Sequence, residues 1–332
     1  MGDGFLREAA SPVVMPAAAS AAAASAAAAP LPVTPGPAAV ASVGSPASAF
    51  AGAGPDNAAA MAARSAGENF PVALRLLPAR HRRYLMAVYG FARTVDDIGD
   101  LAPPGDRARL LDDLEADLGR LYAGQGPAPG LAVIRALRPA VADCAIPAQP
   151  FLDLIQANRQ DQLVSRYRTF DELRGYCRLS ANPVGRIVLH VFGVFTPARA
   201  ELSDQVCTAL QLAEHWQDVG EDFRAGRVYL PGEDMARFGC AESELAAARC
   251  SAALRALIAF ETGRAGALLD AGAPLVGTLH GFARAAVAGY VAGGRAALAA
   301  IGAADHDVLG AVPRPSASRT AAELVRCYVT GR

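Results

Sequence analysis

From Gly67 onward, apolar residues recur every three or four positions, which is the spacing of one face of a helix. Strand signals are nearly absent from the same stretch. Short Val/Ile runs such as "RIVLHVFGVF" occur, but they lack the Thr and aromatic alternation and the Asn-Gly turns that are typical of strands. The sequence therefore predicts an all-α fold.

The predicted helices are separated by breaks rich in Gly and Pro, namely "APPGD", "GQGPAPG", "YLPGED" and "GAP". They cover residues 69–77, 80–99, 106–123, 130–142, 148–163, 170–193, 198–223, 241–271, 276–301 and 318–330. Long apolar helices in such number can enclose a cavity instead of a solid core. We expect one all-α domain over residues 67–332 that encloses a central apolar cavity.

The N-terminal residues 1–66 differ in composition. No charged residue occurs between Pro12 and Pro55, and the segment consists mainly of Ala, Ser and Gly with repeated prolines. Such a sequence can neither bury a core nor hold a continuous membrane helix, so we predict a disordered extension. A signal peptide is the alternative, but Asp3 and Glu8 and the lack of a Leu/Val/Phe-rich core argue against it.

The charge and the cysteines exclude several classes of protein. A formal net charge of −1 over 332 residues gives no indication of nucleic-acid binding. The six cysteines are scattered without a C-x-x-C or His/Cys spacing, which argues against a zinc site or a disulfide framework. No stretch of 18 or more strongly apolar residues follows the N-terminal segment, so we do not expect an integral membrane protein. We expect a cytoplasmic location, and a peripheral contact at the inner face of the membrane is compatible with it.

One predicted helix, "AVYGFARTVDDIGD", carries a polar stripe among apolar residues. Counted from Tyr89, Arg93 lies at i+4, Asp96 at i+7 and Asp100 at i+11, so these side chains share one face. Asp97 is rotated about 100° from that face. We therefore expect Asp97 to tolerate replacement best among the acids of this segment.

A second stripe follows in "LQLAEHWQDVGEDFRAGRVYLP". Counted from Gln211, Glu214 and His215 lie at i+3 and i+4, Asp218 at i+7 and Asp222 at i+11. Glu214 is a further ligand, a base or an outward-facing residue on this pattern. His215 either orients a water or acts as a base, or it is hydrogen-bonded in a polar pocket. The spacing leaves these alternatives open.

An Asp-x-x-x-Asp pair alone is a weak signal. Asp113 and Asp117 lie opposite the leucines of "RLLDDLEADLGRLY", which predicts an ordinary solvated helix face. The two stripes differ from this pair because their neighbours are apolar, and buried carboxylates need a counter-charge. Arg93 cannot neutralise four or five carboxylates.

A hard divalent cation can supply that charge, and oxygen ligands from aspartate favour Mg²⁺ over Zn²⁺. Mg²⁺ keeps open positions that phosphate oxygens fill. The predicted chemistry is the metal-assisted departure of a diphosphate, with Arg93 adding positive charge on the leaving group and an apolar cavity accepting the hydrocarbon. The remaining carbocation needs a pocket with few nucleophiles. The predicted metal ligands are Asp96, Asp100, Asp218 and Asp222.

These segments resemble the squalene/phytoene synthase family of head-to-head isoprenyl diphosphate synthases. "YGFARTVDDIGD" is similar to its first aspartate motif, and "LQLAEHWQDVGEDFRAGRVYLP" is similar to its second. "YCRLSANPVGRIVL" resembles the family segment that lines the hydrocarbon channel. "GENFPVALRLLP" and "GYVAGGRAALAAI" look most like the bacterial hopanoid branch that forms hydroxysqualene.

The resemblance implies an isoprenoid-synthase-type helical bundle. It implies that presqualene diphosphate loses diphosphate with Mg²⁺, that the cation rearranges, and that water captures it to give hydroxysqualene. Partner enzymes of squalene synthesis are also implied. By the resemblance, the four aspartates bind metal and diphosphate, and Arg93, Tyr89, Gln211 and Tyr229 contact the substrate. Phe70, Glu214 and His215 are further candidate substrate-binding residues.

The chain also departs from the family pattern. The usual second motif reads Gln-x-x-Asn-x-x-Arg-Asp, whereas here Glu214 and Gln217 replace the Asn and the Arg. Members that condense two farnesyl chains often carry His and Ser just before the Phe, where this chain has Ala66 to Asn69. Less positive charge beside the phosphates is compatible with a single ionisation. Head-to-head condensation of two prenyl diphosphates and a non-catalytic scaffold role are the alternatives.

Overall fold

The computed structural model of this protein describes residues 77–124 and 126–332. Helices make up the regular structure of these residues. Within these residues, extended segments meet at one isolated parallel bridge, between Arg166 and Val228. The all-α prediction is confirmed. The predicted extension 1–66, the predicted helix 69–77 except its last residue, and Phe70 lie outside the described residues.

The described elements follow one another as short and long helices, with α for α-helices and η for 3₁₀-helices. They are α3 (Ala79–Leu101), α4 (Arg107–Ala123), α5 (Ala132–Cys144), α6 (Gln149–Asp161), α7 (Phe170–Ser180), α8 (Asn182–Val191), α9 (Pro197–Gln217), α10 (Val219–Arg224), α11 (Gly232–Phe238), η1 (Glu242–Ala246), α12 (Ala252–Gly272), η2 (Ala273–Thr278), α13 (Gly281–Ala303) and α14 (Ala317–Thr330).

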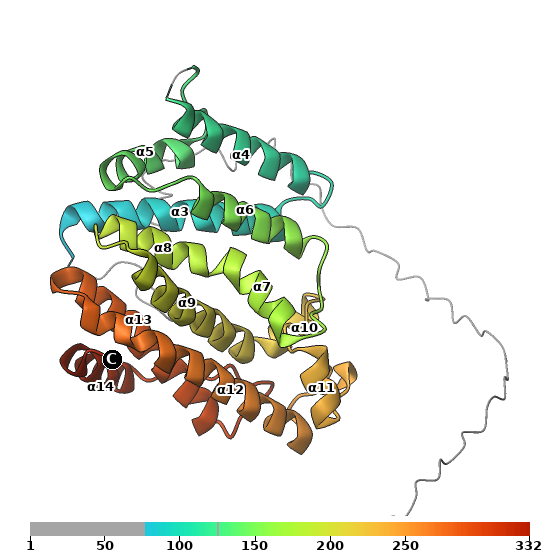
Figure 1. The fold of residues 1–332 in the computed structure, drawn as a ribbon. Helices are drawn as coiled ribbons and strands as arrows, with labels where there is room; N and C mark the ends of the chain where they lie inside the picture. Colours follow the sequence, from blue (N-terminus) through green and yellow to red (C-terminus); the bar gives the residue numbers. More distant parts are fainter. Residues whose placement is uncertain (1–76, 125) are drawn as a thin grey trace, which may run out of the picture. The chain divides into compact units, whose positions relative to one another are not determined.

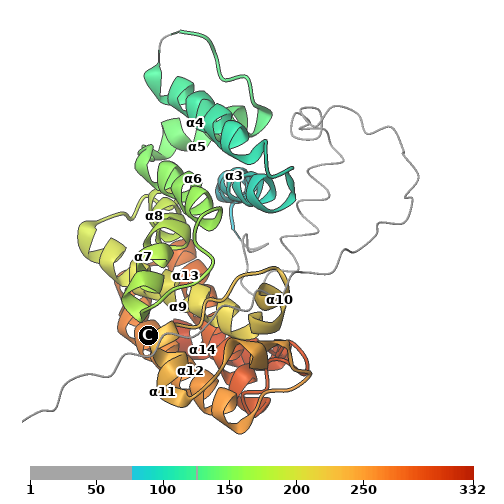
Figure 2. The ribbon, with the colours of Figure 1, turned by 90° about the vertical axis from the view of Figure 1, so that its right-hand side faces the viewer.

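The helices lie in successive layers (Figure 1). Helices α4 and α5 lie at one end, followed by α3 with α6, then α7 with α8, then α9, and finally α12, α13 and α14. The view turned by 90° keeps α4 and α5 at the opposite end from α11 and α12 (Figure 2). Because α9 lies between α8 and α12, residues on opposite sides of this helix contact different halves of the core.

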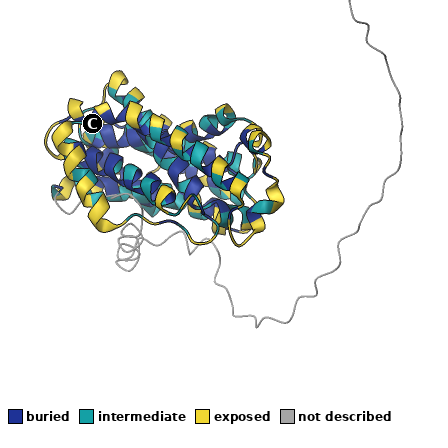
Figure 3. Cartoon of the chain, turned by 90° about the horizontal axis from the view of Figure 1, so that it is seen from below, coloured by how far each residue is buried: buried dark blue, intermediate teal, exposed yellow. Residues whose placement is uncertain are grey.

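The core consists of two clusters of buried side chains. One lies around α3, α5 and α6, where Phe91 meets the edge of Phe151 at 5.1 Å between ring centroids. The other lies around α9, α12 and α13 and includes the fully buried Trp216. Tyr290 of α13 packs against both clusters. Buried residues line the inward faces of the helices, and exposed residues lie on the outward faces (Figure 3). This pattern explains the apolar period in the sequence.

Two predicted helices are each broken into two. The segment 170–193 is interrupted at Ala181, because Pro183, the second residue of α8, has no N–H with which to continue the hydrogen bonding of α7. The segment 198–223 is interrupted at Asp218, whose φ of −101° and ψ of 12° separate α9 from α10. The predictions of continuous helices there are wrong.

The predictions after residue 230 need three corrections. Helix α11 lies where "YLPGED" predicts a break. The segment 241–271 holds η1 and a separate α12, which begins after Ser251 because the hydroxyl of this residue accepts from Leu254 N at 3.1 Å and caps the helix. The segment 276–301 holds the end of η2 and then α13, which begins at Gly281.

Helix α13 is the one described helix that is long and apolar enough to span a membrane. However, 72% of its most apolar window is buried among other helices. Small residues such as Gly294 allow that burial, because a Cβ there would lie 2.6 Å from Leu210 Cδ2 of α9. Its apolar composition is therefore what a central core helix requires.

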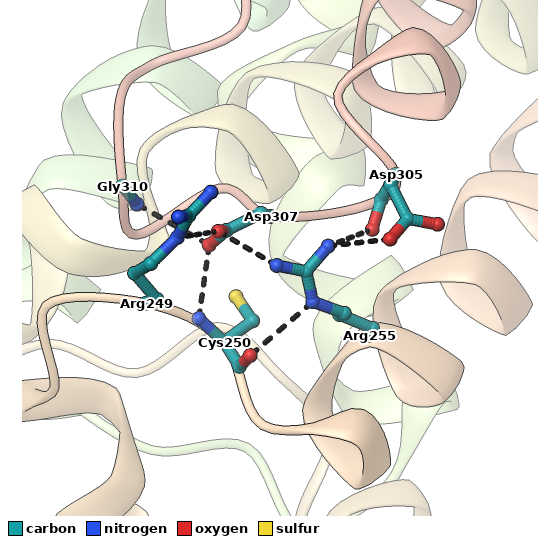
Figure 4. A network of polar contacts seen from close by, with 6 residues as sticks. All are labelled: Arg249, Cys250, Arg255, Asp305, Asp307 and Gly310. Carbon is teal, nitrogen blue, oxygen red and sulfur yellow. Dashed lines mark hydrogen bonds and ion pairs between the residues drawn. The ribbon is translucent and has the colours of Figure 1, made fainter.

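A polar network fixes the loop that follows α13 (Figure 4). The buried Asp307 carboxylate accepts hydrogen bonds from Arg249 Nε and Arg255 Nη2, each at 2.8 Å, and from the backbone N–H of Cys250 at 2.9 Å. The backbone N–H of Gly310 donates to the same carboxylate at 3.3 Å. These bonds tie the loop to the segment that leads into α12, and they hold the pKa of Asp307 well below its usual range.

Candidate active site

A cavity of about 290 Å³ lies among α3, α8, α9, η2 and α13, which confirms the predicted apolar cavity. Its volume is near the lower end of the range for small-molecule pockets, about 300–1,000 Å³. Its walls are mainly aliphatic side chains. The lining residues include Leu85, Val88, Ala92, Val184, Val188, Leu189, Val206, Leu210, Leu275 and Val287.

The first stripe reaches the cavity through Tyr89 and Asp96, both of which line it. Asp96 is exposed by accessible surface, but it lines the cavity and many protein atoms lie around it. Burial raises the pKa of Asp96 to about 7; the charge of Arg93 opposes this shift, and the charge of Asp100 adds to it. The site thus holds a carboxylate whose negative charge is poorly compensated.

Arg93 forms its ion pair with Asp97, at 2.9 Å between Nη2 and Oδ1. The interpretation that set Asp97 apart from Arg93 is wrong. Residues four positions apart lie side by side on a helix, and the long arginine side chain can turn toward Asp97 as easily as toward Asp96 at i+3. Arg93 therefore connects Asp97 to the polar stripe.

Asp100 contacts the end of the second stripe through a residue that the spacing argument missed. Arg227 Nη2 lies 2.7 Å from Asp100 Oδ1. The positive charge of Arg227 also attracts the carboxylates of Asp161 and Asp222, and it partly opposes the rise in their pKa values that burial causes. It precedes Tyr229 in the "RVYLP" that closes the second motif, so its position in that motif was the available signal. Arg227 is the cation between the two stripes.

The acids of the two stripes lie close enough to repel each other. Burial raises the pKa of Asp222 to about 7, and the charges of Asp218 and Asp100 add to this effect. Burial also raises the pKa of Asp218, and Glu221 adds to this shift. The structure thus brings together Asp100 and Asp222, from the two separate segments.

Asp161, at the end of α6, is a further acid at this position that the sequence analysis did not identify. Tyr176 donates its hydroxyl to Asp161 at 2.8 Å, and burial raises the pKa of Asp161 to about 6. The charge of Asp100 adds to this shift. No stripe or motif marks Asp161 in the sequence, because its neighbours come from other helices.

His215 lies in an aromatic stack beside this cluster. Its ring is stacked on Tyr229 at 3.7 Å between centroids, and Gln211 Nε2 lies 3.3 Å from its Nε2. Burial lowers the pKa of His215 to about 3, with help from the charge of Arg227, so the ring is neutral at pH 7. Its Nδ1 lies 4.0 Å from Asp222 Oδ2. Glu214, the preceding residue, lines the cavity.

The loop after α13 supports the second stripe. Gln217, at the end of α9, is buried and donates its side-chain amide to the carbonyl of Pro313. A Cβ on Gly220 would lie 3.1 Å from Leu309 Cδ2, so α10 packs closely on the same loop. The charge of Arg314, one residue further, lowers the pKa of Asp218. The loop that follows Asp307 therefore contacts the residues on either side of Asp218.

The carboxylates fit magnesium by their chemistry. Five of them, Asp96, Asp100, Asp161, Asp218 and Asp222, supply only oxygen ligands, and burial leaves three of them with pKa values near 6 or 7. Among the described residues, no three His, Cys, Asp or Glu side chains are arranged to hold a metal ion by themselves. Mg²⁺ needs only one or two protein carboxylates when phosphate oxygens and waters complete its shell.

Of the two acids on helix α4 that were predicted to lie on a solvated face, Asp113 and Asp117, only Asp113 does so. Asp113 is exposed and pairs with Arg109 at 3.0 Å. Asp117 is 1% exposed, and its carboxylate accepts from the backbone N–H groups of Gly130 and Leu131 at 2.8 and 2.7 Å. The prediction for Asp117 is wrong, because this acid satisfies a loop that the helical period does not show.

Comparison with known proteins now decides the family. The model of the squalene/phytoene synthase family matches residues 63–321. The chain belongs to this family. The match includes both stripes, the aromatic stack around His215 and nearly all described helices. This squalene/phytoene synthase family member therefore carries its cavity and its acids within the residues that the family model matches.

Individual relatives agree with this assignment. The chain is 38% identical to a hydroxysqualene synthase of Sinorhizobium fredii over 218 residues, which are 65% of this chain and 72% of the relative. It is 35% identical to a phytoene synthase of Mycobacterium tuberculosis over 178 residues, 53% of this chain and 57% of the relative. Among solved structures, squalene synthase HpnC from Alicyclobacillus acidocaldarius matches with a TM-score of 0.68 and 41% identity, covering 76% of this chain and 94% of that one.

Proposed function

We propose that this family member converts presqualene diphosphate to hydroxysqualene with Mg²⁺, releasing diphosphate and capturing the carbocation with water. The observation that carries the proposal is the apolar cavity lined by Asp96, beside a cluster where Arg227 joins Asp100 to the second stripe. The similarity to a hydroxysqualene synthase and to HpnC supports the choice within the family.

The residues divide the work between the two ends of the substrate. The hydrocarbon binds in the aliphatic cavity, which excludes water from the carbocation. Magnesium, when bound by the aspartates, supplies the positive charge that stabilises the departing diphosphate. Arg93 and Arg227 add fixed positive charge beside the acids. Tyr89 lies on the cavity wall, and Tyr229 lies in the stack against His215.

The direct test is to incubate the protein with presqualene diphosphate and Mg²⁺ and to analyse the lipids formed. Hydroxysqualene is the expected product; only phytoene-like or cyclic products, or none, would contradict the proposal. Asp96→Asn and Asp218→Asn should abolish turnover and leave the far-ultraviolet circular dichroism unchanged. Asp113→Asn, on an exposed helix face, is the matched control that should keep full turnover.

The second candidate is condensation of two prenyl diphosphates, to presqualene diphosphate, dehydrosqualene or phytoene. The similarity to a phytoene synthase favours it. Incubation with farnesyl or geranylgeranyl diphosphate alone distinguishes the two, because hydroxysqualene formation from presqualene diphosphate does not need these substrates. A non-catalytic scaffold is the third candidate. Retention of so many poorly compensated acids speaks against it, since unused buried charge destabilises a fold.

The proposed reaction also implies partner enzymes and a location in the cell. Partner enzymes of squalene synthesis would supply presqualene diphosphate and consume the alcohol. Both compounds carry long hydrocarbon chains, so a cytoplasmic enzyme with a peripheral contact at the inner membrane face suits them. Co-sedimentation of the protein with phospholipid vesicles, with and without product, tests this contact.

A further inference from the structure

The acids of the first stripe lie at the end of α3 that least favours negative charge. Asp96, Asp97 and Asp100 all lie in the last two turns of this helix. The last carbonyls of a helix carry partial negative charge, so they destabilise nearby carboxylates and stabilise nearby cations. Helix α3 has no basic residue of its own in its last turn. A cation from another element can therefore stabilise this end of the helix.

Arg107, the first residue of α4, supplies that cation. Its Nε donates a hydrogen bond to the carbonyl of Ala102 at 2.9 Å, and its Nη2 donates to the carbonyl of Asp100 at 3.3 Å. The turn between the two helices contains Pro103 and Pro104, whose fixed φ angles limit the paths that it can take. An arginine at the first position is unfavourable for α4 itself, because the positive end of that helix dipole lies there. The charge of Arg107 therefore stabilises the end of α3 and not the start of α4.

Gln162, directly after α6, extends this contact to a third helix. Its side-chain oxygen accepts from Arg107 Nη1 at 2.8 Å, and its side-chain nitrogen donates to the carbonyls of Gly99 at 3.4 Å and Asn158 at 3.2 Å. A Cβ on Gly99 would lie 1.9 Å from Asn158 Oδ1, so no side chain separates α3 from α6 at this point. Gln162 also follows Asp161 directly in the sequence. The network therefore joins the acid-bearing end of α3 to the acid-bearing end of α6.

We infer that Arg107 is a positioning residue, which holds Asp100 where its carboxylate binds magnesium and diphosphate; this inference rests on the proposed function. Arg107 binds the backbone carbonyl of Asp100, whereas Arg227 binds its carboxylate. In the described part of the chain, the hydrogen bonds of Arg107 end on neutral oxygens. Its guanidinium therefore orients the helix end that carries the acid and leaves the carboxylate oxygens to their other partners.

The substitution Arg107→Gln removes the charge and shortens the side chain that reaches α3. Isothermal titration of the folded protein with inorganic diphosphate, at a fixed excess of Mg²⁺, measures binding without any turnover. We expect the dissociation constant to rise about 10- to 100-fold, the usual effect of losing a group that orients a metal ligand. Arg107→Lys keeps the charge and should restore part of the affinity. Gln162→Ala disrupts the same network from α6 and should also weaken binding.

Arg159→Gln is the matched control. Arg159 also joins α6 to α4, through ion pairs with Asp112 and Glu115, but these pairs involve no atom of α3. The control should keep the wild-type affinity, even where urea unfolding shows a loss of stability. Unchanged affinity in Arg107→Gln, or equal weakening by Arg159→Gln, overturns the role of Arg107 and leaves the proposed function intact. If wild type itself does not bind diphosphate with Mg²⁺, the proposed function has failed.

Discussion

Arg227 Nη2 lies 2.7 Å from Asp100 Oδ1, so a residue that follows the second acidic stripe contacts the last acid of the first stripe. This contact crosses from the loop before Tyr229 to the C-terminal turn of α3. Asp161 and Asp222 lie near enough to be attracted by the same guanidinium. One arginine therefore compensates three acids from three elements.

Replacing Arg227 by Gln should cost activity more than stability. The variant leaves Asp100, Asp161 and Asp222 without this shared cation, and a diphosphate would meet a more negative site. We expect diphosphate release to fall about 100-fold, the effect of losing one preorganised charged donor. Steady-state kinetics with presqualene diphosphate would measure it.

Arg224→Gln is the control for that experiment, because Arg224 is exposed on α10, three residues before Arg227. It should keep wild-type kinetics. A fall of similar size in both variants would mean that the general positive charge of this segment matters, and not the contact with Asp100.

The close approach of α8 to α9 at the cavity leads to a second prediction. A Cβ on Gly185 would lie 2.4 Å from Ser203 Oγ and 2.5 Å from Cys207 Sγ, and all three residues line the cavity. Gly185→Ala should therefore destabilise the fold by about 1–3 kcal/mol, the usual effect of overpacking. Urea unfolding would measure the change.

The matched control is Gly263→Ala. Gly263 is also helical, but its added Cβ would meet nothing within 4 Å. This substitution should be neutral or stabilise by up to about 1 kcal/mol, because alanine favours helices. If both variants behave alike, contact with Ser203 and Cys207 does not limit the packing of α8.

The sequence predicts the helices well where one face is continuously apolar. The spacing of Tyr89, Arg93, Asp96 and Asp100 was sufficient to place a polar stripe on a buried helix. The helical period did not predict the break at Asp218, where the backbone leaves the helix for one residue. The sequence also did not predict α11, because Pro231 and Gly232 are typical of a turn, whereas Pro231 here precedes the first turn of a helix. Such local choices depend on neighbours distant in sequence.

The site shows the same limit. Asp161 and Arg227 belong to it because α6 and the loop after α10 meet the end of α3, and a periodic pattern within one helix cannot report that meeting. The pairing of Arg93 with Asp97, and not with Asp96, is likewise a choice between two spacings that the sequence allows equally. Residues on one helix were predictable, and their partners on others were not.

The Asp307 network should contribute to stability without touching the cavity. Asp307→Asn weakens bonds from Arg249, Arg255 and Cys250 N. Because Arg249 itself is largely exposed, we expect a loss of only about 1–3 kcal/mol, the range for buried hydrogen bonds to a charged group. Chemical denaturation at pH 7 would measure it.

Asp305→Asn is the control, because the Asp305 side chain is 89% exposed although it also pairs with Arg255. It should change stability by less than about 0.5 kcal/mol. The low pKa of Asp307 also sets a direction with pH: its contribution is present above the ordinary pKa of aspartate and is lost as the pH falls below it. Equal effects of the two substitutions at pH 7 would contradict this account.

Glu261 should make the stability of the fold depend on pH in the opposite direction. It is fully buried on α12, where one arginine, Arg264, contacts both Glu261 at 3.3 Å and Asp234 at 2.9 Å. Burial raises the pKa of Glu261 to about 8; Arg264 opposes the shift and Asp234 adds to it. The folded protein thus keeps a proton on Glu261 at a pH where the unfolded chain has lost it.

The sign follows from proton binding. Between the ordinary pKa of a glutamic acid and about 8, the folded state binds more protons than the unfolded state, so the free energy of unfolding decreases as the pH rises. Glu261→Gln removes this contribution while keeping the side-chain shape. From pH 5 to pH 8, wild type should lose about 3–4 kcal/mol more stability than Glu261→Gln, as judged from the size of the shift. Asp96, Asp161 and Asp222 titrate alike in both proteins and cancel in this comparison. Urea unfolding across that pH range measures this difference in stability. Glu201→Gln, at an exposed position of α9, is the control. Parallel curves of stability against pH for wild type and Glu261→Gln would show that Glu261 ionises normally.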